Sequence, residues 1–395
     1  MNPAETSAVL EPSADGKALA GFLLSGFLLA LLGAVLPAWG YHRDPPAFTA
    51  VGNYFLSLAV GIVAASGSAR LILARRGLPF LLVSGCTAAC AALAYLALVG
   101  PPLPAWWRVA GLLVLGTGAG FVNIALFHAI SRRYFDAAGT VNKGGIWYGL
   151  GCLVATLLVA GTFYAYTVPS ILIFMAVVPG IFAGIYSKTA YATPPETAQP
   201  TIREAVQDFR SPSALIFALL LLFQFGNEWS IAGWLPLFLI RRLGLSPQSA
   251  LMQLALYWLC LLGGRLVAVA ILPRVKHYRL LMASVLSALF GCLILYSTDN
   301  TFGAGTSVVF LGLGYASMYP LVIEAIGRRF PYYQPGFFNG IFSWALVGGL
   351  LAPATLGYAA SAWGVGVVIG VPLVGTFMVT ALLPLIWLEA KVSGR

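Results

Sequence analysis

Long apolar stretches alternate with short polar connections along this chain, from about residue 17 to residue 389. Nearly all of them reach the roughly 20 residues that an α-helix needs to cross a hydrocarbon core about 30 Å thick. Such a core offers the backbone no water, so helices that satisfy their own hydrogen bonds are favoured there. The pattern predicts an all-α integral membrane protein with twelve transmembrane helices, at residues 18–39, 47–66, 78–99, 105–128, 141–164, 167–186, 213–240, 247–272, 278–297, 301–326, 336–360 and 363–388.

The composition and the placement of charge agree with a lipid environment. Only 9% of the residues are charged and 60% are hydrophobic, so the lipid bilayer is the expected partner of most of the surface. Of the 22 Lys and Arg residues, 17 lie on the side of the two termini, four on the other side and one within a span. Basic residues near span ends stay in the cytoplasm, which predicts a multi-pass protein of the cell membrane with cytoplasmic N- and C-termini. The anionic inner leaflet explains the net charge of +10, and no nucleic-acid partner is expected.

The longest polar segment divides the spans six and six. It predicts an N-terminal six-helix bundle in residues 1–186, a cytoplasmic linker in residues 187–212 and a C-terminal six-helix bundle in residues 213–395. Within the linker, the sequence TIREAVQDF has a Thr cap and amphipathic spacing. These features predict a short helix on the inner membrane surface.

The two halves of the chain repeat one another at an offset of 196 residues. The matching pairs in the fourth and tenth spans are Gly116 and Gly312, Gly118 and Gly314, His128 and Glu324, Arg132 and Arg328, and Arg133 and Arg329. Parallel six-helix repeats predict two bundles related by pseudo-two-fold symmetry, with a solute site between them that opens alternately to the two sides. Glycines such as Gly149 and Gly312 give smooth helix surfaces, which we expect to shift against each other during transport.

Two loops carry a family resemblance. The segment GSARLILARRGLP after the second span resembles the signature G-x-x-x-D-R-x-G-R-R of the major facilitator superfamily, without its acidic residue, and GGRLVAVAILPRVKHYR after the eighth span is its counterpart. The resemblance covers essentially the whole chain and implies the major facilitator fold and a secondary transporter. In that family these loops hold one half together in one access state, which implies a gating role for Arg75 and Arg76.

Three further segments resemble the sugar/proton symporter branch of that superfamily, which includes fucose and glucose carriers. They are FQFGNEWSIAGWLPLFL in the seventh span, the Gly264–Arg265 pair in the eighth and GLGYASMYP in the tenth. This resemblance implies a sugar as the solute and H⁺ as the coupling ion. The first-half carboxylates of the fucose-type carriers have no equivalent here, because the first span has none and the fourth presents Asn123 and His128.

Ionisable residues inside spans are functional candidates because each costs about 2.5–3.5 kcal/mol on insertion scales. Glu228 lies near the middle of the seventh span, one helical turn from Gln224, and is the candidate for proton coupling. The alternative is a permanently protonated Glu that ties two helices together.

Arg265 and Glu324 are expected to pair as a gate at the inner ends of the second half. His128, near a helix end, is expected to have a packing role.

Polar and aromatic residues on the spans supply a candidate solute pocket. Amides hydrogen-bond hydroxyl groups in both directions and aromatic faces stack on sugar rings, so the mixture suits a neutral polyhydroxy solute. The alternative for each aromatic residue is an interfacial belt or a helix contact. The candidates are Asn53, Asn123, Trp147, Tyr148, Gln224, Asn227, Tyr257, Trp258, Tyr315, Tyr319, Asn339 and Trp344.

Other classes of protein fit the sequence less well. No span combines a nucleophile with a base, no Walker loop is present and the three His residues are scattered, so we expect no enzyme, no cofactor and no metal. The chain is expected to work as a monomer.

A proton-driven efflux pump for lipophilic drugs or lysolipids is the second hypothesis, because the pocket candidates are rich in aromatic residues. An apolar pocket open sideways to lipid would favour efflux, and a pocket rich in amides would favour a sugar.

Overall fold

The structure is a computed structural model that describes residues 12–130, 137–189, 191, 211–272, 274–330 and 340–392. In this part of the chain, 11 helices are long and apolar enough to cross a membrane. A 3₁₀ turn, η2 (Gly340–Phe342), precedes α11. The helices are α1 (Pro12–Ala38), α2 (Phe48–Leu98), α3 (Ala105–Ile130), α4 (Ala137–Thr162), α5 (Val168–Ser187), α7 (Pro212–Leu243), α8 (Pro247–Ile271), α9 (His277–Ser297), α10 (Thr301–Arg329), α11 (Ser343–Trp363) and α12 (Val367–Val392).

The long helix α2 contains two of the predicted spans. It runs for 51 residues and leaves helical geometry at Gly77, where φ is 79° and ψ is 176°. Counting the two sides of this break separately gives twelve crossings, so the predicted all-α membrane fold is confirmed. The segment 67–76 was expected to be a loop, but it is helical because its Ala, Arg and Leu residues favour helices. Only glycine adopts a positive φ without strain, so the break falls at Gly77.

The turn between the last two spans lies later than predicted. Helix α11 continues to Trp363, and the chain turns at Gly364 with a φ of 84°. Hydropathy does not mark this turn because the residues around it are apolar, whereas the backbone conformation requires a glycine. The surface helix predicted for TIREAVQDF falls outside the described residues.

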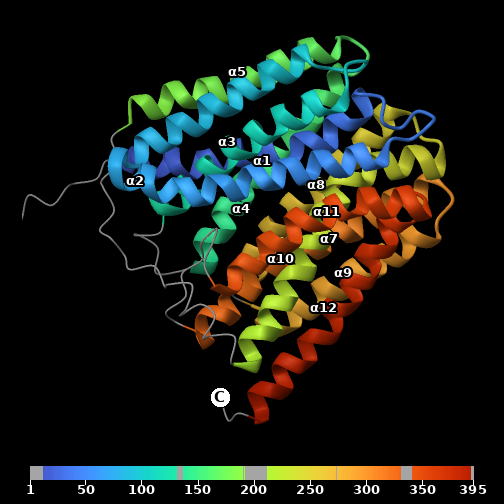
Figure 1. The fold of residues 1–395 in the computed structure, drawn as a ribbon. Helices are drawn as coiled ribbons and strands as arrows, with labels where there is room; N and C mark the ends of the chain where they lie inside the picture. The colour runs from blue at the N-terminus through green and yellow to red at the C-terminus, as the bar shows by residue number, and fades with distance from the viewer. Residues whose placement is uncertain are drawn as a thin grey trace, which may run out of the picture.

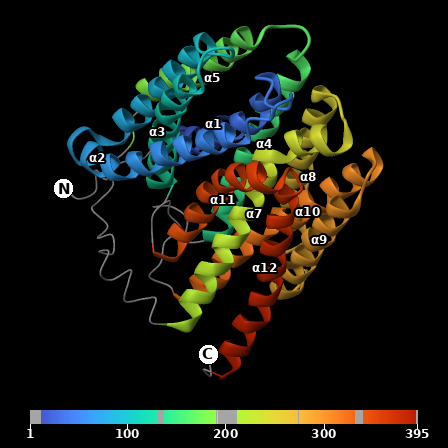
Figure 2. The ribbon, with the colours of Figure 1, turned by 45° about the vertical axis from the view of Figure 1, so that its right-hand side comes forward.

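The helices form two groups, α1–α5 and α7–α12. Figures 1 and 2 show the two groups converging at one end and diverging towards the other. We name the first the short-loop end, since it carries the short connections 39–47, 99–104, 163–167, 244–246, 298–300 and 364–366. The opposite end, where α1 begins and α12 ends, is the termini end.

The repeat detected in the sequence appears as repeated helix packing. A Cβ atom added at any of four glycines would lie within 2.8 Å of a neighbouring backbone oxygen. These oxygens belong to Leu58 for Gly116, Gly85 for Gly118, Tyr257 for Gly312 and Ser284 for Gly314. In each half, therefore, one glycine-faced helix packs tightly against two neighbouring spans, which in the first half are the two arms of α2.

The glycines expected at the moving interface have two different locations. Gly312 packs within the second half, as described above. Gly149 of α4 faces α8 across the two groups, and an added Cβ would lie 3.7 Å from Leu262, an ordinary contact distance. Only Gly149 of this pair therefore lies where the two halves meet.

The two groups are joined by polar and aromatic contacts at the short-loop end. Arg241 binds Asp44 at 2.6 Å, and the Tyr358 hydroxyl donates to the Asn53 side chain at 2.5 Å. The Trp234 ring of α7 packs near two aromatic rings of α2, with a centroid distance of 6.1 Å to Phe55. This end of the molecule is closed in the structure.

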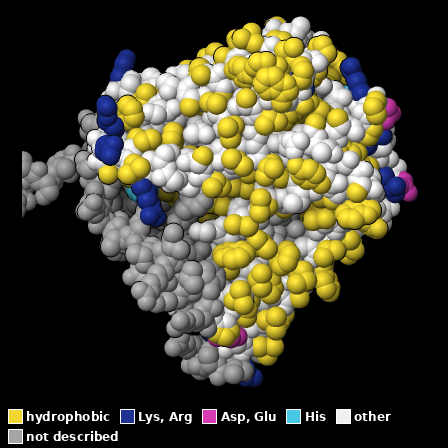
Figure 3. Space-filling model, viewed as in Figure 1, with side chains coloured by type: hydrophobic (Ala, Val, Ile, Leu, Met, Phe, Trp, Pro, Cys, Tyr) yellow, Lys and Arg dark blue, Asp and Glu magenta, His cyan; other side chains and the backbone are white. Residues whose placement is uncertain are grey.

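The outer surface matches a membrane environment. Figure 3 shows charged side chains near the ends of the molecule and hydrophobic side chains over the face between them. Large apolar side chains are exposed on the helices of both halves, among them Phe174 at 61% and Phe377 at 61%. Exposed apolar side chains of this size are stable against lipid but not against water.

Candidate functional site

A buried pair of opposite charges lies in the middle of the second half. Glu228 on α7 is 4% exposed and Arg265 on α8 is 5% exposed. The carboxylate oxygen Oε1 lies 3.9 Å from the guanidinium nitrogen NH2, which is close enough for attraction but too long for a hydrogen bond. Two charges at this depth are stable only with partners, so each controls the state of the other.

Arg265 also reaches two other helices. Its nitrogen NH1 donates to the backbone oxygen of Gly145 on α4, in the other half. Its Nε donates to the backbone oxygen of Ala316 on α10 at 3.4 Å. A Cβ atom at residue 145 would lie 3.0 Å from NH1, so a glycine gives the arginine room to approach this carbonyl. The guanidinium group therefore connects the carboxylate to the contact between the halves.

Three tyrosines surround the pair, one each from α4, α8 and α10. Tyr148, Tyr257 and Tyr319 all lie close enough to interact electrostatically with both Glu228 and Arg265. All three were candidates from the sequence, and the structure brings them together around the two charges. Tyr319 also packs edge-on against Phe225, with ring centroids 4.7 Å apart.

Several buried polar atoms near this pair have no hydrogen-bond partner among the described residues. Gln224, one turn before Glu228, is 0% exposed and lies within hydrogen-bonding reach of the Glu228 carboxylate, and its amide makes no other hydrogen bond among the described residues. The Tyr257 hydroxyl and the indole nitrogen of Trp258, whose ring packs against that of Tyr257, make no hydrogen bond in this part of the chain. Buried polar groups without partners are costly, so this cluster is suited to a polar ligand.

Asn227 and Tyr315 lie in a different place from the other candidates. The Asn227 amide donates to Thr376 of α12 at 3.2 Å, and the Tyr315 hydroxyl lies 3.0 Å from the same threonine oxygen. Cys292 of α9 approaches that oxygen at 3.7 Å. These residues form a network behind α7 that joins four helices of the second half.

The remaining pocket candidates are spread through the molecule. Asn123 accepts a hydrogen bond from Ser25 at 2.7 Å, within the first half. Asn53 lies at the short-loop end, in the contact with Tyr358 described above. Trp147 and Trp344 are 38% and 37% exposed. Asn339 lies outside the described residues.

The expected pairing of Arg265 with Glu324 is not seen. Glu324 instead accepts from Arg328 at 2.5 Å and lies 2.7 Å from His277. These partners lie at the termini end, whereas Arg265 lies deeper and faces Glu228. Depth along a helix was estimated from the sequence, but the direction of each side chain around its helix was not, and direction decides the pairing.

The other residues expected near the termini end have simple surroundings. Arg75 and Arg76 are exposed at the end of the helical segment before Gly77, and Arg76 lies over the Phe80 ring at 5.5 Å. The ring nitrogen Nδ1 of His128 lies 2.9 Å from the backbone oxygen of Ile124. In the described part of the chain, no group of three His, Cys, Asp or Glu side chains is placed to hold a metal ion.

A second buried arginine was not singled out by the sequence. Arg108 near the start of α3 is 4% exposed. It donates to the hydroxyls of Tyr54 at 2.7 Å and Tyr41 at 3.1 Å, and to the backbone oxygens of Val99 and Leu103, both at 3.0 Å. Its position three residues inside a predicted span suggested a solvated interface, and no sequence signal marked its distant tyrosine partners.

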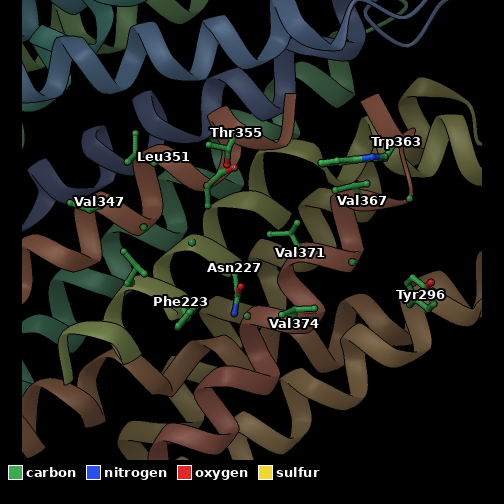
Figure 4. Close-up of a pocket in the computed structure, with 17 residues that line it drawn as sticks. Phe223, Asn227, Tyr296, Val347, Leu351, Thr355, Trp363, Val367, Val371 and Val374 are labelled. Carbon is green, nitrogen blue, oxygen red and sulfur yellow. Dashed lines mark hydrogen bonds between the residues drawn. The ribbon is translucent and has the colours of Figure 1, made fainter. Parts of the chain in front are cut away.

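A groove of about 800 Å³ lies on the side of the second half. It runs between α11 and α12, with α7 at its base, and Figure 4 shows Asn227 and Phe223 on that base. Its walls are mostly apolar and are described further below. Consecutive residues of a helix point about 100° apart, and Asn227 lines the groove whereas Glu228 and Arg265 do not, so the groove and the buried charge pair lie on different faces of α7.

Comparisons with known proteins agree with this architecture. A family model of the Major Facilitator Superfamily matches residues 144–353, more than half of the chain. An uncharacterised MFS-type transporter of Yersinia pestis is 22% identical over 371 residues, which cover 88% of this chain and 89% of that protein.

Three solved structures share the fold, each at 14% sequence identity. A D-xylose–proton symporter has a TM-score of 0.74, with 95% of this chain and 97% of that chain covered. The fucose–proton symporter of E. coli has a TM-score of 0.63, with coverages of 95% and 98%. The nucleoside transporter NupG has a TM-score of 0.70, with coverages of 94% and 99%. Together with the family match and the twelve crossings, these findings show that the chain is a multi-pass membrane transporter belonging to the Major Facilitator Superfamily.

Proposed function

We propose that this transporter moves a small neutral polar solute, such as a sugar, and couples its movement to protons at Glu228. The observation that carries the proposal is the set of buried polar groups beside the charge pair, namely the Gln224 amide at the carboxylate and the Tyr257 hydroxyl, which has no hydrogen-bond partner among the described residues. An amide donates and accepts, as a sugar hydroxyl does, and the neighbouring tyrosine and tryptophan rings suit the apolar faces of a sugar. Two structural neighbours are named as sugar–proton symporters, which supports the same class.

The charge balance of the site favours a neutral solute. Glu228 and Arg265 offset one another when both are ionised, so the pair presents no net charge to the solute. A phosphate ester or a dicarboxylate would need additional cations to be stable at this depth.

Arg265 gives a physical route for proton coupling. When Glu228 binds a proton, Arg265 loses its counter-ion, and the carbonyls of Gly145 and Ala316 become its main partners. When Glu228 loses the proton, the carboxylate attracts the guanidinium back. Protonation therefore strengthens the bond across the halves and deprotonation weakens it, which links the proton to the contact that alternating access must break.

The contacts at the short-loop end act as a gate in this proposal. The bond between Asn53 and Tyr358 and the ion pair between Asp44 and Arg241 both join the two halves. With both termini in the cytoplasm, the structure would be the state closed to the outside. These contacts must open for the solute to enter or leave on that side.

Transport in proteoliposomes tests the proposal. Labelled hexoses, pentoses and nucleosides are offered with an imposed proton gradient, an imposed sodium gradient or neither. We expect one neutral solute to accumulate only with the proton gradient, and E228Q to keep solute exchange while losing uphill accumulation. E324Q removes a carboxylate at the termini end and serves as the matched control. Uphill uptake by E228Q at the wild-type level would remove Glu228 from the mechanism.

The lateral groove supports the second hypothesis, export of lipophilic drugs or lysolipids. It is apolar and borders α7, the helix that carries Glu228. The same proteoliposomes loaded with amphiphiles distinguish the two functions. Proton-driven loss of a lysolipid, without uptake of any neutral solute, would favour the efflux pump over the sugar symporter.

A further inference from the structure

The groove between α7, α11 and α12 has the character of a hydrocarbon site. Its walls are built from aliphatic side chains and glycines, and Figure 4 shows the valines of α12 facing Val347 and Leu351 of α11 across it. The Asn227 amide at its base is 3% exposed and already donates to Thr376. A polar ligand would find few partners here.

Two glycines, one just before α12 and one within it, keep the groove open. A Cβ atom added at Gly366 or Gly370 would meet no atom within 4 Å, so these glycines border free space rather than a packed neighbour. The opposite situation holds at Gly348 of α11, where an added Cβ would lie 1.9 Å from the backbone oxygen of Leu222. Helix α11 is therefore fixed against α7, while α12 stands away from α11.

The groove opens towards lipid and not towards the solute site. Leu351, Val371 and Val374 on its walls are 46%, 42% and 62% exposed on the outside of the bundle. An empty apolar groove would lose dispersion contacts along its walls, and water would find few hydrogen-bond partners there. Hydrocarbon from the bilayer is the material that fills such a space.

The dimensions fit one leaflet. The groove follows α12 from Val367 to Gly375, a rise of about 12 Å at 1.5 Å per residue, and half of a hydrocarbon core is about 15 Å. At the short-loop end of the groove lie Trp363, 78% exposed, and Tyr296, 58% exposed. Such aromatic side chains lie at the level of lipid headgroups.

We propose that this groove binds one acyl chain of a membrane phospholipid. The headgroup lies beside Trp363 and Tyr296 in the leaflet at the short-loop end, and the chain runs along α12 towards Asn227. This site is separate from the proposed solute site, and the proposal holds whatever the transported solute is.

A photoactivatable phospholipid tests the site. The probe carries a diazirine in the middle of one acyl chain and is incorporated into nanodiscs with the purified protein. We expect labelling to concentrate on peptides that contain Leu351 and Val371–Val374. In G370F the new ring fills the groove, and labelling of these peptides should fall about tenfold, as a loss of about 1.4 kcal/mol in binding would produce.

A matched variant and a second position on α12 give the controls. Gly184 on α5 also borders open space and is exposed, so G184F adds the same ring elsewhere and should leave the labelling unchanged. V374F fills the groove from the opposite end and should repeat the effect if G370F does not fold. Labelling spread evenly around the protein, or unchanged in both groove variants, would overturn the proposal. Cross-links between two copies of the chain through this face would overturn it as well.

Discussion

Among the described residues, each half buries one arginine at almost the same exposure, yet the surroundings of the two side chains differ. Arg108 in the first half is surrounded by two tyrosine hydroxyls and two backbone oxygens, all from its own half. Arg265 in the second half divides its contacts among a carboxylate, a carbonyl of its own half and a carbonyl of the other half. A charge whose partners all move with it stabilises one bundle. A charge whose partners lie in both bundles senses their relative position.

Replacing each arginine by methionine should separate these roles, with the largest effect at Arg265. R265M leaves Glu228 without a counter-ion, so the carboxyl should hold its proton and uphill transport should be lost. R108M should keep coupling but lower the free energy of unfolding by about 2–4 kcal/mol, because several buried hydrogen-bond partners are left unsatisfied. Proton-driven uptake and thermal unfolding in detergent are measured on both variants. Normal coupling in R265M would contradict the distinction.

A second comparison concerns glycines within and between the halves. G312L places a large side chain against the Tyr257 backbone and Cys260, where even a Cβ would lie 2.6 Å away. We expect it to destabilise the second half by about 1–3 kcal/mol or more. G149L faces α8 at ordinary contact distance, so it should fold but slow the exchange of solute. Folded yield and single-turnover exchange rates separate the two effects. Equal folding and equal exchange in both variants would contradict the placement of the interface.

The smallest expected effect is a pH dependence at the short-loop end. Burial lowers the pKa of His42 from 6.5; the nearby charges of Arg43 and of Arg241 from the other half lower it further, and a hydrogen bond with Pro37 opposes them. Arg241 is close only when the halves meet, so protonation of His42 disfavours the closed end. The fraction of molecules whose short-loop end is closed should therefore be largest above about pH 6.5 and should fall as the pH drops below it.

Distances between spin labels at Leu103 and Phe302, one exposed residue in each half near this end, would report that population. The H42Q variant should lose the pH dependence while keeping the distance seen at neutral pH. A pH response that persists in H42Q would assign it to another group.

The fold could be predicted from the sequence because hydropathy marks each membrane crossing. The repeat shows which span of the first half corresponds to which span of the second half. The sequence also indicated Glu228 and Arg265, since a charge inside a span is costly and visible. It paired Arg265 with Glu324 because a charge within a span needs a partner and both residues lie towards the inner ends of spans in the second half. Contacts between helices depend on the rotation of each helix about its own axis, and that rotation is set by packing across the whole bundle.

The rotation of each helix about its axis also explains which pocket candidates lie close to one another in the structure. Gln224 and Tyr257 lie near the charge pair, while Asn227, only three residues from Gln224, belongs to the network with Thr376. Arg108 escaped detection because the position of a basic residue near a span end predicts exposure, whereas tyrosines distant in the sequence enclose it.

The single break in α2 has a mechanical consequence. A flexible loop would let its two neighbouring spans tilt independently, but here the two helical arms of α2 meet at one non-helical residue, Gly77. The angle between the two arms is set by the φ and ψ angles of that residue. The two arms are therefore rigid levers that share one hinge, and a leaning motion begun at the Asn53 contact turns the first arm about Gly77 without unwinding either arm.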